Sequence, residues 1–132
     1  MPILNVKVSA PDSREKTREI AAALSELTAT ILGKDPNVTA IAIDHVDPDH
    51  WIIGGKPLTE HRKSSFFLDI KITDSTNTKD DKARYIAAVF ERMGVLLGDL
   101  HTESYVHVHD VHGYAYGYGG LTQEYRYVKA KN

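Results

Sequence analysis

Hydrophobic and polar residues alternate over two stretches of the chain that match each other. Residues 3–9 have the sequence Ile-Leu-Asn-Val-Lys-Val-Ser, and residues 67–73 have the sequence Phe-Leu-Asp-Ile-Lys-Ile-Thr. Each apolar position of the first stretch falls on an apolar position of the second, and Lys7 falls on Lys71. A period of two predicts a β-strand in each stretch. The match between them indicates an internal repeat.

A helix with apolar residues three or four positions apart is predicted after each strand. Gly33 and Gly98 are predicted to end the two helices, as glycines commonly do. Each helix is predicted to start with a capping-box pattern, Asp12 as the cap with Glu15 three residues on in the first helix, and Thr78 with Asp81 in the second. The apolar stripes are Ile20, Leu24, Leu27 and Ile31 in the first helix, and Ile86, Phe90, Met93 and Leu97 in the second.

A second strand is predicted in each half, at residues 39–46 and 105–111, and each half then reaches a pair of glycines. Two β-α-β units imply parallel pairing within each unit. Together they predict an α/β fold, a four-stranded sheet with two helices on one face. The other face stays uncovered, so apolar residues there would need a partner subunit.

The whole chain, residues 1–132, is predicted to be a single domain made of two repeats. The repeats occupy about residues 1–55 and 66–120, with a polar connection at 56–65 and a C-terminal tail at 121–132. Within the tail, residues 123–128 alternate around Tyr125 and Tyr127 and predict a short additional strand.

The composition of the chain limits its possible binding partners, its covalent chemistry and its expected location. A formal net charge of -2 gives the chain no general attraction to nucleic acid or to anionic membranes. The absence of cysteine excludes disulfides, thiolate metal sites and cysteine nucleophiles. It also suits a reducing, cytoplasmic location. Neither a signal-peptide pattern nor an apolar run of membrane-spanning length is present, so no membrane association is expected.

Pro2 is the residue with the most distinctive potential chemistry. It follows Met1 directly and precedes the first predicted strand. Removal of Met1, which a small residue at position 2 normally permits, would leave a free secondary amine, a far better base than an amide nitrogen. A strand would hold that nitrogen in place, whereas most N-termini fray. The alternative is that Pro2 merely begins an edge strand, where the missing N–H costs nothing.

Four segments of the chain together resemble the tautomerase superfamily. Residues 1–3, Met-Pro-Ile, match the start of that family, and residues 50–55, His-Trp-Ile-Ile-Gly-Gly, resemble a segment of 4-oxalocrotonate tautomerase. Residues 33–36, Gly-Lys-Asp-Pro, resemble the lysine-bearing turn of macrophage migration inhibitory factor. Residues 105–110 resemble the strand that carries its pocket tyrosine and asparagine. The doubled length is similar to that of the fused members of the superfamily.

The resemblance implies a cofactor-free isomerase that acts on a small α-keto or enol carboxylic acid. Pro2 would be the catalytic base, and Lys34, Tyr105 and His107 would bind the carboxylate or the developing enolate oxygen. Trp51 would form an apolar wall of a neighbour's pocket. The resemblance also implies a homotrimer whose active sites lie between subunits. No metal or cofactor is expected.

Each of these residues also has a structural interpretation. Lys34 can act as a favourable charge at a helix C-terminus, and Trp51 can be a packing residue. Tyr105, His107 and His109 alternate on one strand face and can form a polar row in a subunit interface. The tyrosines at positions 114, 116 and 118 are predicted to pack at the subunit boundary rather than to wall the pocket.

The sequence leaves three alternatives open, two of them functions and one a metal site. One is hydration or decarboxylation of a small unsaturated acid with Pro2 as the general acid, and another is a trimeric binding or signalling protein with an inert Pro2. A third is a metal site built from His107, His109 and His112. Residues 73–79 contain no arginine where chloroacrylic acid dehalogenases carry a pair, which argues against dehalogenation.

Overall fold

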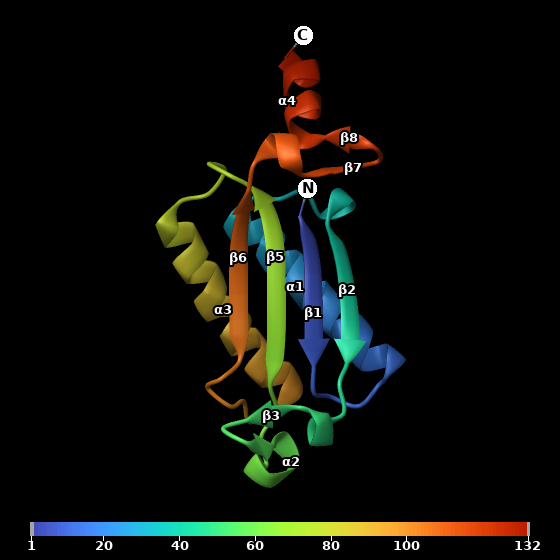
Figure 1. Cartoon of the computed structure of the whole chain (residues 1–132), viewed down its shortest axis with the longest axis vertical. Coiled ribbons are helices and arrows are strands. Elements are labelled where there is room, and N and C mark those ends of the chain that lie inside the picture. The colour runs from blue at the N-terminus through green and yellow to red at the C-terminus, as the bar shows by residue number, and fades with distance from the viewer. Residues whose placement is uncertain (1, 132) are drawn as a thin grey trace.

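The computed structural model describes residues 2–131 of the chain and has two layers, a four-stranded sheet and two long helices (Figure 1). The strand order is β2-β1-β5-β6, with β1 parallel to β2, β5 parallel to β6, and β1 antiparallel to β5. The elements are β1 (Ile3–Val8), α1 (Arg14–Leu32), β2 (Ala40–His45), β5 (Phe66–Thr73), α3 (Lys79–Leu97) and β6 (Tyr105–Val111).

Both long helices lie behind the sheet in Figure 1, which confirms the predicted α/β fold. The strand residues that face the helices are apolar and almost completely buried, because alternate residues of a strand point to one face. These residues are Leu4, Val6 and Val8 of β1 and Phe66, Leu68, Ile70 and Ile72 of β5. The opposite face of the sheet is mostly polar and includes Asn5, Lys7, Lys71, His107 and His109. Covering that face therefore requires polar contacts rather than apolar ones alone.

Helix α1 begins one residue later than the sequence predicts. Ser13 is the N-cap, and its side chain accepts a hydrogen bond from the backbone N–H of Lys16 at 3.2 Å. The assignment of Asp12 as the cap was wrong, because the serine hydroxyl supplies the acceptor for that orphan amide. Gly33 ends the helix in a left-handed conformation, φ 70°, as predicted.

Helix α3 has the predicted capping box of Thr78 and Asp81, and its C-cap is Gly98, as predicted. Its buried stripe, however, differs from the predicted one. Tyr85, Val89 and Met93 are buried, whereas Ile86 and Phe90 are 41% and 37% exposed. Burial of Tyr85 is possible because its hydroxyl lies 2.8 Å from that of Thr28 in α1.

Each half of the chain ends in a small hairpin followed by a helix. The hairpin β3 (Ile52–Ile53) and β4 (Lys56–Pro57) leads into α2 (Leu58–His61). The hairpin β7 (Gly117–Tyr118) and β8 (Leu121–Thr122) leads into α4 (Gln123–Lys131). Both glycine pairs have positive φ angles, from 59° to 82°, as tight two-residue hairpin turns require. The glycine pairs are therefore turn residues.

These elements correct one prediction. The additional strand at residues 123–128 is wrong, because this segment is the helix α4. Its first turn is stabilised by the Thr122 hydroxyl, which accepts a hydrogen bond from the Tyr125 N–H at 2.9 Å. The polar connection at 56–65 contains β4 and α2. Short 3₁₀ turns occur at η1 (Pro36–Val38), η2 (Pro48–His50) and η3 (Gly113–Ala115). Over residues 2–131, no helix has the length and apolar character needed to cross a membrane.

Candidate functional site

Pro2 lies at the end of the sheet where β1 begins, and it is buried. By strand alternation it shares the helix-facing side with Leu4 and Val6. Its carbonyl oxygen accepts a hydrogen bond from the N–H of Ala40 at 3.2 Å, which ties it to the first residue of β2. Removal of Met1 concerns a residue outside the described range.

Lys34 lies at the same end of the sheet as Pro2. It follows the C-cap of α1 and precedes β2, whose first residue pairs with Ile3. Its Nζ donates a hydrogen bond to Thr76 Oγ1 at 2.9 Å, in the loop after β5. Partial burial lowers the pKa of the Lys34 ammonium below its ordinary range, while the carboxylates of Asp110 and Asp81 act in the opposite direction. The lysine is therefore a partly desolvated cation, which suits it to bind an anionic ligand.

Tyr105 and His107 lie far from Pro2 of the same chain. In the sheet register Tyr105 is opposite Phe67, which is opposite Lys7, five residues beyond Pro2. At about 3.4 Å per residue, this places Tyr105 about 17 Å further along the sheet. His107 is in register with Asn5, about 10 Å along the sheet from Pro2.

The Tyr105 phenol is already engaged in the isolated chain. Its hydroxyl donates to the Glu103 carboxylate at 2.5 Å. This hydrogen bond and the negative charge of Glu103 raise the pKa of Tyr105. The phenol therefore stays protonated at neutral pH and remains a hydrogen-bond donor.

Trp51 lies near the end of the chain's fold opposite to Pro2, where Figure 1 places β3 and α2. Its backbone N–H donates to the Pro48 oxygen at 3.3 Å, and its own carbonyl accepts from the Leu58 N–H at 2.9 Å. One chain therefore brings Pro2 and Lys34 to one end, while Tyr105 and Trp51 lie toward the other.

The histidines of the second half are arranged in two separate places. The rings of His107 and His109 stack with centroids 5.2 Å apart on the open sheet face. The Nδ1 of His112 lies instead 3.0 Å from the Asp74 carboxylate. Within residues 2–131, no group of three potential ligands is arranged to hold a metal ion.

Tyr116 lies at the same end of the sheet as Pro2, and the sequence predicted only a packing role for it. Its hydroxyl donates to the Lys71 carbonyl at 3.2 Å and accepts a hydrogen bond from the backbone of Ile3, the residue after Pro2. Burial raises the pKa of this phenol, while the Ile3 hydrogen bond acts in the opposite direction. No sequence signal distinguishes Tyr116 from its neighbours Tyr114 and Tyr118, because only the sheet register brings it to β1.

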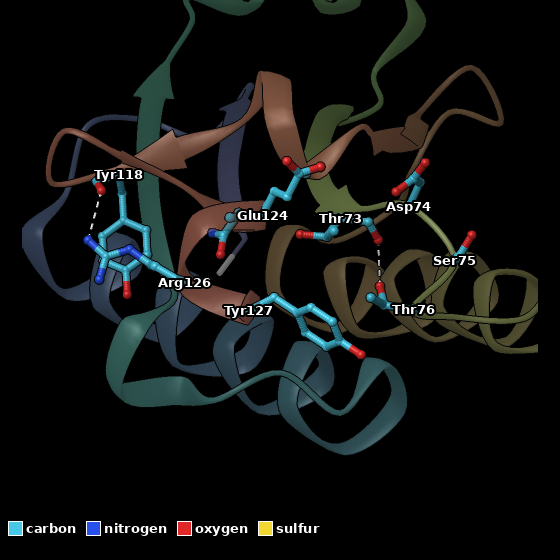
Figure 2. A pocket seen from close by; sticks show the side chains of 10 residues that line it. Thr73, Asp74, Ser75, Thr76, Tyr118, Glu124, Arg126 and Tyr127 are labelled. Carbon is cyan, nitrogen blue, oxygen red and sulfur yellow. Dashed lines mark hydrogen bonds between the residues drawn. The ribbon is translucent and has the colours of Figure 1, made fainter. Parts of the chain in front are cut away.

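An open pocket of about 630 Å³ lies beside this region, between the loop after β5 and the helix α4 (Figure 2). Thr76, the partner of Lys34, is part of its lining. On another side the Arg126 guanidinium stacks over the Tyr118 ring at 3.9 Å and donates to the Tyr118 carbonyl at 2.9 Å. Pro2 is not part of the lining of this pocket.

The fold and these residues define a two-repeat α/β protein with a buried proline at its N-terminal strand. A family model described as "Tautomerase enzyme" matches residues 2–61, beginning at Pro2. The chain is also 33% identical over 66 residues to "Probable tautomerase K2" of Dickeya dadantii (strain 3937). That alignment covers 49% of this chain and 98% of the relative. The chain therefore belongs to the tautomerase family of enzymes.

Solved structures of the same fold match almost the whole chain. The structure described as "F6 fused 4-OT wild type asymmetric trimer" has a TM-score of 0.81 and 17% sequence identity, over 94% of this chain and 98% of that one. A macrophage migration inhibitory factor-like protein from Entamoeba histolytica has a TM-score of 0.75 and 21% identity, over 92% and 97%. At these identities the similarity shows the fold.

Proposed function

We propose that this protein is a cofactor-free tautomerase of small α-keto or enol carboxylic acids, with the amine of Pro2 as its base after Met1 is removed. The observation that carries the proposal is the buried position of Pro2 at the first residue of the family-matched segment, with Lys34 at the same end of the sheet. A free amine in this position is held by the strand rather than frayed.

The proposed chemistry is a proton transfer between oxygen and carbon of one substrate. Pro2 takes the proton from the enol hydroxyl, or from the carbon beside the keto group, and returns it at the other atom. A base is most effective when its pKa lies near the working pH, and a free N-terminal amine has a pKa of about 8. Burial favours the neutral amine and lowers this pKa, and a cation close to the amine, the role proposed for Lys34, would act in the same direction.

Lys34 is the proposed anion-binding residue. Its partly buried ammonium is fixed by Thr76 at 2.9 Å and can pair with a substrate carboxylate or stabilise an enolate oxygen. Tyr105 and His107 are proposed to donate hydrogen bonds to the same substrate from a neighbouring subunit, because both lie too far from Pro2 of their own chain. Trp51 is proposed to wall that pocket.

The proposal includes a homotrimer with active sites between subunits. The fused 4-oxalocrotonate tautomerase of similar fold is described as a trimer. Within residues 2–131, no helix covers the polar open face of the sheet, which carries Lys7, Lys71 and His107 (Figure 1). A subunit interface would cover that face.

Ketonisation of phenylenolpyruvate and of 2-hydroxymuconate, followed by ultraviolet absorbance, tests the function. The Pro2→Ala variant keeps a free amine but loses the ring that fixes the position of the nitrogen, so it is expected to lose about a hundredfold in kcat/KM, the scale of a misplaced reacting group. The Lys34→Met variant is expected to raise KM, because it loses the carboxylate partner. Lys79→Met is the matched control, since Lys79 is an exposed cation in the first turn of α3.

Three outcomes would contradict the proposal in whole or in part. Unchanged activity of Pro2→Ala would exclude a requirement for the secondary amine of Pro2. Inactivity of the wild-type protein, with Met1 retained, would leave an inert Pro2 and favour a binding or signalling role. Turnover of an unsaturated acid by hydration or decarboxylation, in place of ketonisation, would keep Pro2 but change the reaction.

A further inference from the structure

The peptide unit between Pro2 and Ile3 is fixed on both of its sides. On one side the Pro2 carbonyl accepts a hydrogen bond from Ala40 of β2 at 3.2 Å. On the other side the Ile3 N–H donates to the Tyr116 hydroxyl. That hydroxyl in turn donates to the Lys71 carbonyl at 3.2 Å. Because Ile3 and Lys71 are partners in the sheet register, one phenol bridges β1 and β5 at their first pair.

This bridge places the Tyr116 hydroxyl close to the proposed base. Standard bond lengths keep the nitrogens of Pro2 and Ile3 within about 3.6 Å of each other. A hydrogen bond adds about 3 Å between the Ile3 nitrogen and the phenol oxygen. The oxygen therefore lies within about 7 Å of the Pro2 nitrogen, in the same chain.

We propose that Tyr116 is a positioning residue that holds the N-terminal proline in its reactive orientation. The inference rests on the proposed function of Pro2 as a base. A terminal residue is normally free to fray, whereas proton transfer requires the base to be held close to one geometry. The phenol fixes the peptide plane between Pro2 and Ile3. Because the Pro2 ring and nitrogen are attached directly to this plane, fixing it restricts the orientation of the base.

The C-terminal segment of the chain holds Tyr116 in turn. Its carbonyl accepts a hydrogen bond from the N–H of Gln123, the first residue of α4, at 2.7 Å. Tyr116 also directly precedes the hairpin of β7 and β8. The second repeat thereby contributes to the environment of a base that lies in the first repeat. Burial raises the pKa of the Tyr116 phenol. The phenol therefore stays protonated over the pH range in which the Pro2 amine would titrate, and the bridge is kept over that range.

The test compares Tyr116→Phe with Tyr114→Phe, a change that removes an exposed hydroxyl two residues away. Tyr116→Phe is expected to lower kcat for ketonisation by about ten- to a hundredfold, the scale of a small misplacement of a reacting group. KM is expected to stay within about threefold, because Lys34 still binds the carboxylate. Tyr114→Phe is expected to match the wild type in both.

The pH profile separates positioning from general loss of structure. The acetylenic keto acid 2-oxo-3-pentynoate labels a free amine by addition across its triple bond; no group leaves, and the amine proton ends on the adjacent carbon. In Tyr116→Phe the pH midpoint of labelling at Pro2 is expected to move upward, because a loosened terminus is better solvated and its pKa rises. Labelling and kcat equal to the wild type in this variant would overturn the inference.

Two further observations distinguish a failure of the proposed function from a failure of the Tyr116 bridge. Failure of the wild-type protein to label at Pro2 would reject the proposed function itself, whereas normal wild-type labelling with an unaffected Tyr116→Phe rejects only the bridge. If the variant does not fold, amide exchange in the wild-type protein decides. The bridge predicts a protected Ile3 N–H, and exchange at the rate of an unstructured amide would overturn it.

Discussion

Two variants that are each expected to be inactive, one altered at Pro2 and the other on strand β6, are expected to restore activity when their subunits are mixed. One is Pro2→Ala, and the other is the double variant Tyr105→Phe, His107→Ala. In one chain, Tyr105 lies about 17 Å further along the sheet than Pro2 and two strands away. With strands about 4.8 Å apart, the separation is about 19 Å, which no tyrosine side chain spans. A site that uses both groups must therefore combine two subunits.

The size of the recovery follows from the geometry. In the proposed cyclic trimer each site would take Pro2 from one subunit and Tyr105 from the next. After equal amounts of the two variants are mixed and exchanged, half of the subunits supply an intact Pro2 and half an intact Tyr105. About one quarter of the sites are then complete, so the mixture is expected to show about a quarter of the wild-type activity.

The assay is ketonisation of phenylenolpyruvate after mild denaturation and joint refolding of the two variants. Each variant refolded alone is the control, and size-exclusion chromatography verifies that both assemble. Recovery near a quarter supports a shared site. If the mixture is no more active than the mean of its components, the site lies within one chain and the assignment of Tyr105 and His107 is refuted.

Two predictions concern stability. Burial raises the pKa of Tyr85 to about 12, above its unfolded value of about 10. The folded state therefore holds this proton more tightly, and the associated stability is complete below pH 10 and lost as pH rises through 12. The loss is about 3 kcal/mol. Urea denaturation should show it in the wild type but not in Tyr85→Phe, and equal losses in both would contradict the assignment. Gly117→Ala should loosen the β7–β8 hairpin, because its Cβ would lie 2.1 Å from the Leu121 oxygen; hydrogen exchange at β8 that equals the wild type would contradict this.

The sequence was sufficient to predict the fold because local and repeated signals agreed. The matched alternation of residues 3–9 and 67–73 gave two of the four strands, and the capping box of Thr78 and Asp81 was correct in the structure. Residues 123–128 were misassigned because tyrosines two apart suggest a strand, while the Thr122 cap and the packing of α4 against η3 favour a helix.

The arrangement of the site was less accessible to sequence reasoning. Pro2 could be singled out from its place before a strand, and Lys34 from the resemblance of residues 33–36 to the lysine-bearing turn of a family member. The sheet register alone shows that Tyr105 lies toward the end of the sheet away from Pro2. Tyr116 was missed because its contact with Ile3 joins residues more than a hundred positions apart. Neither a motif nor a period reports a contact of that kind.

The central claim is that the secondary amine of Pro2 is the reactive group. Intact-mass measurement of the purified wild-type protein, before and after reaction with 2-oxo-3-pentynoate, tests it most directly. The account predicts a chain without Met1 that gains one reagent per subunit, with the adduct on the Pro2 fragment and activity lost in proportion. A chain that retains Met1, or an adduct on another residue such as Lys34, would contradict it.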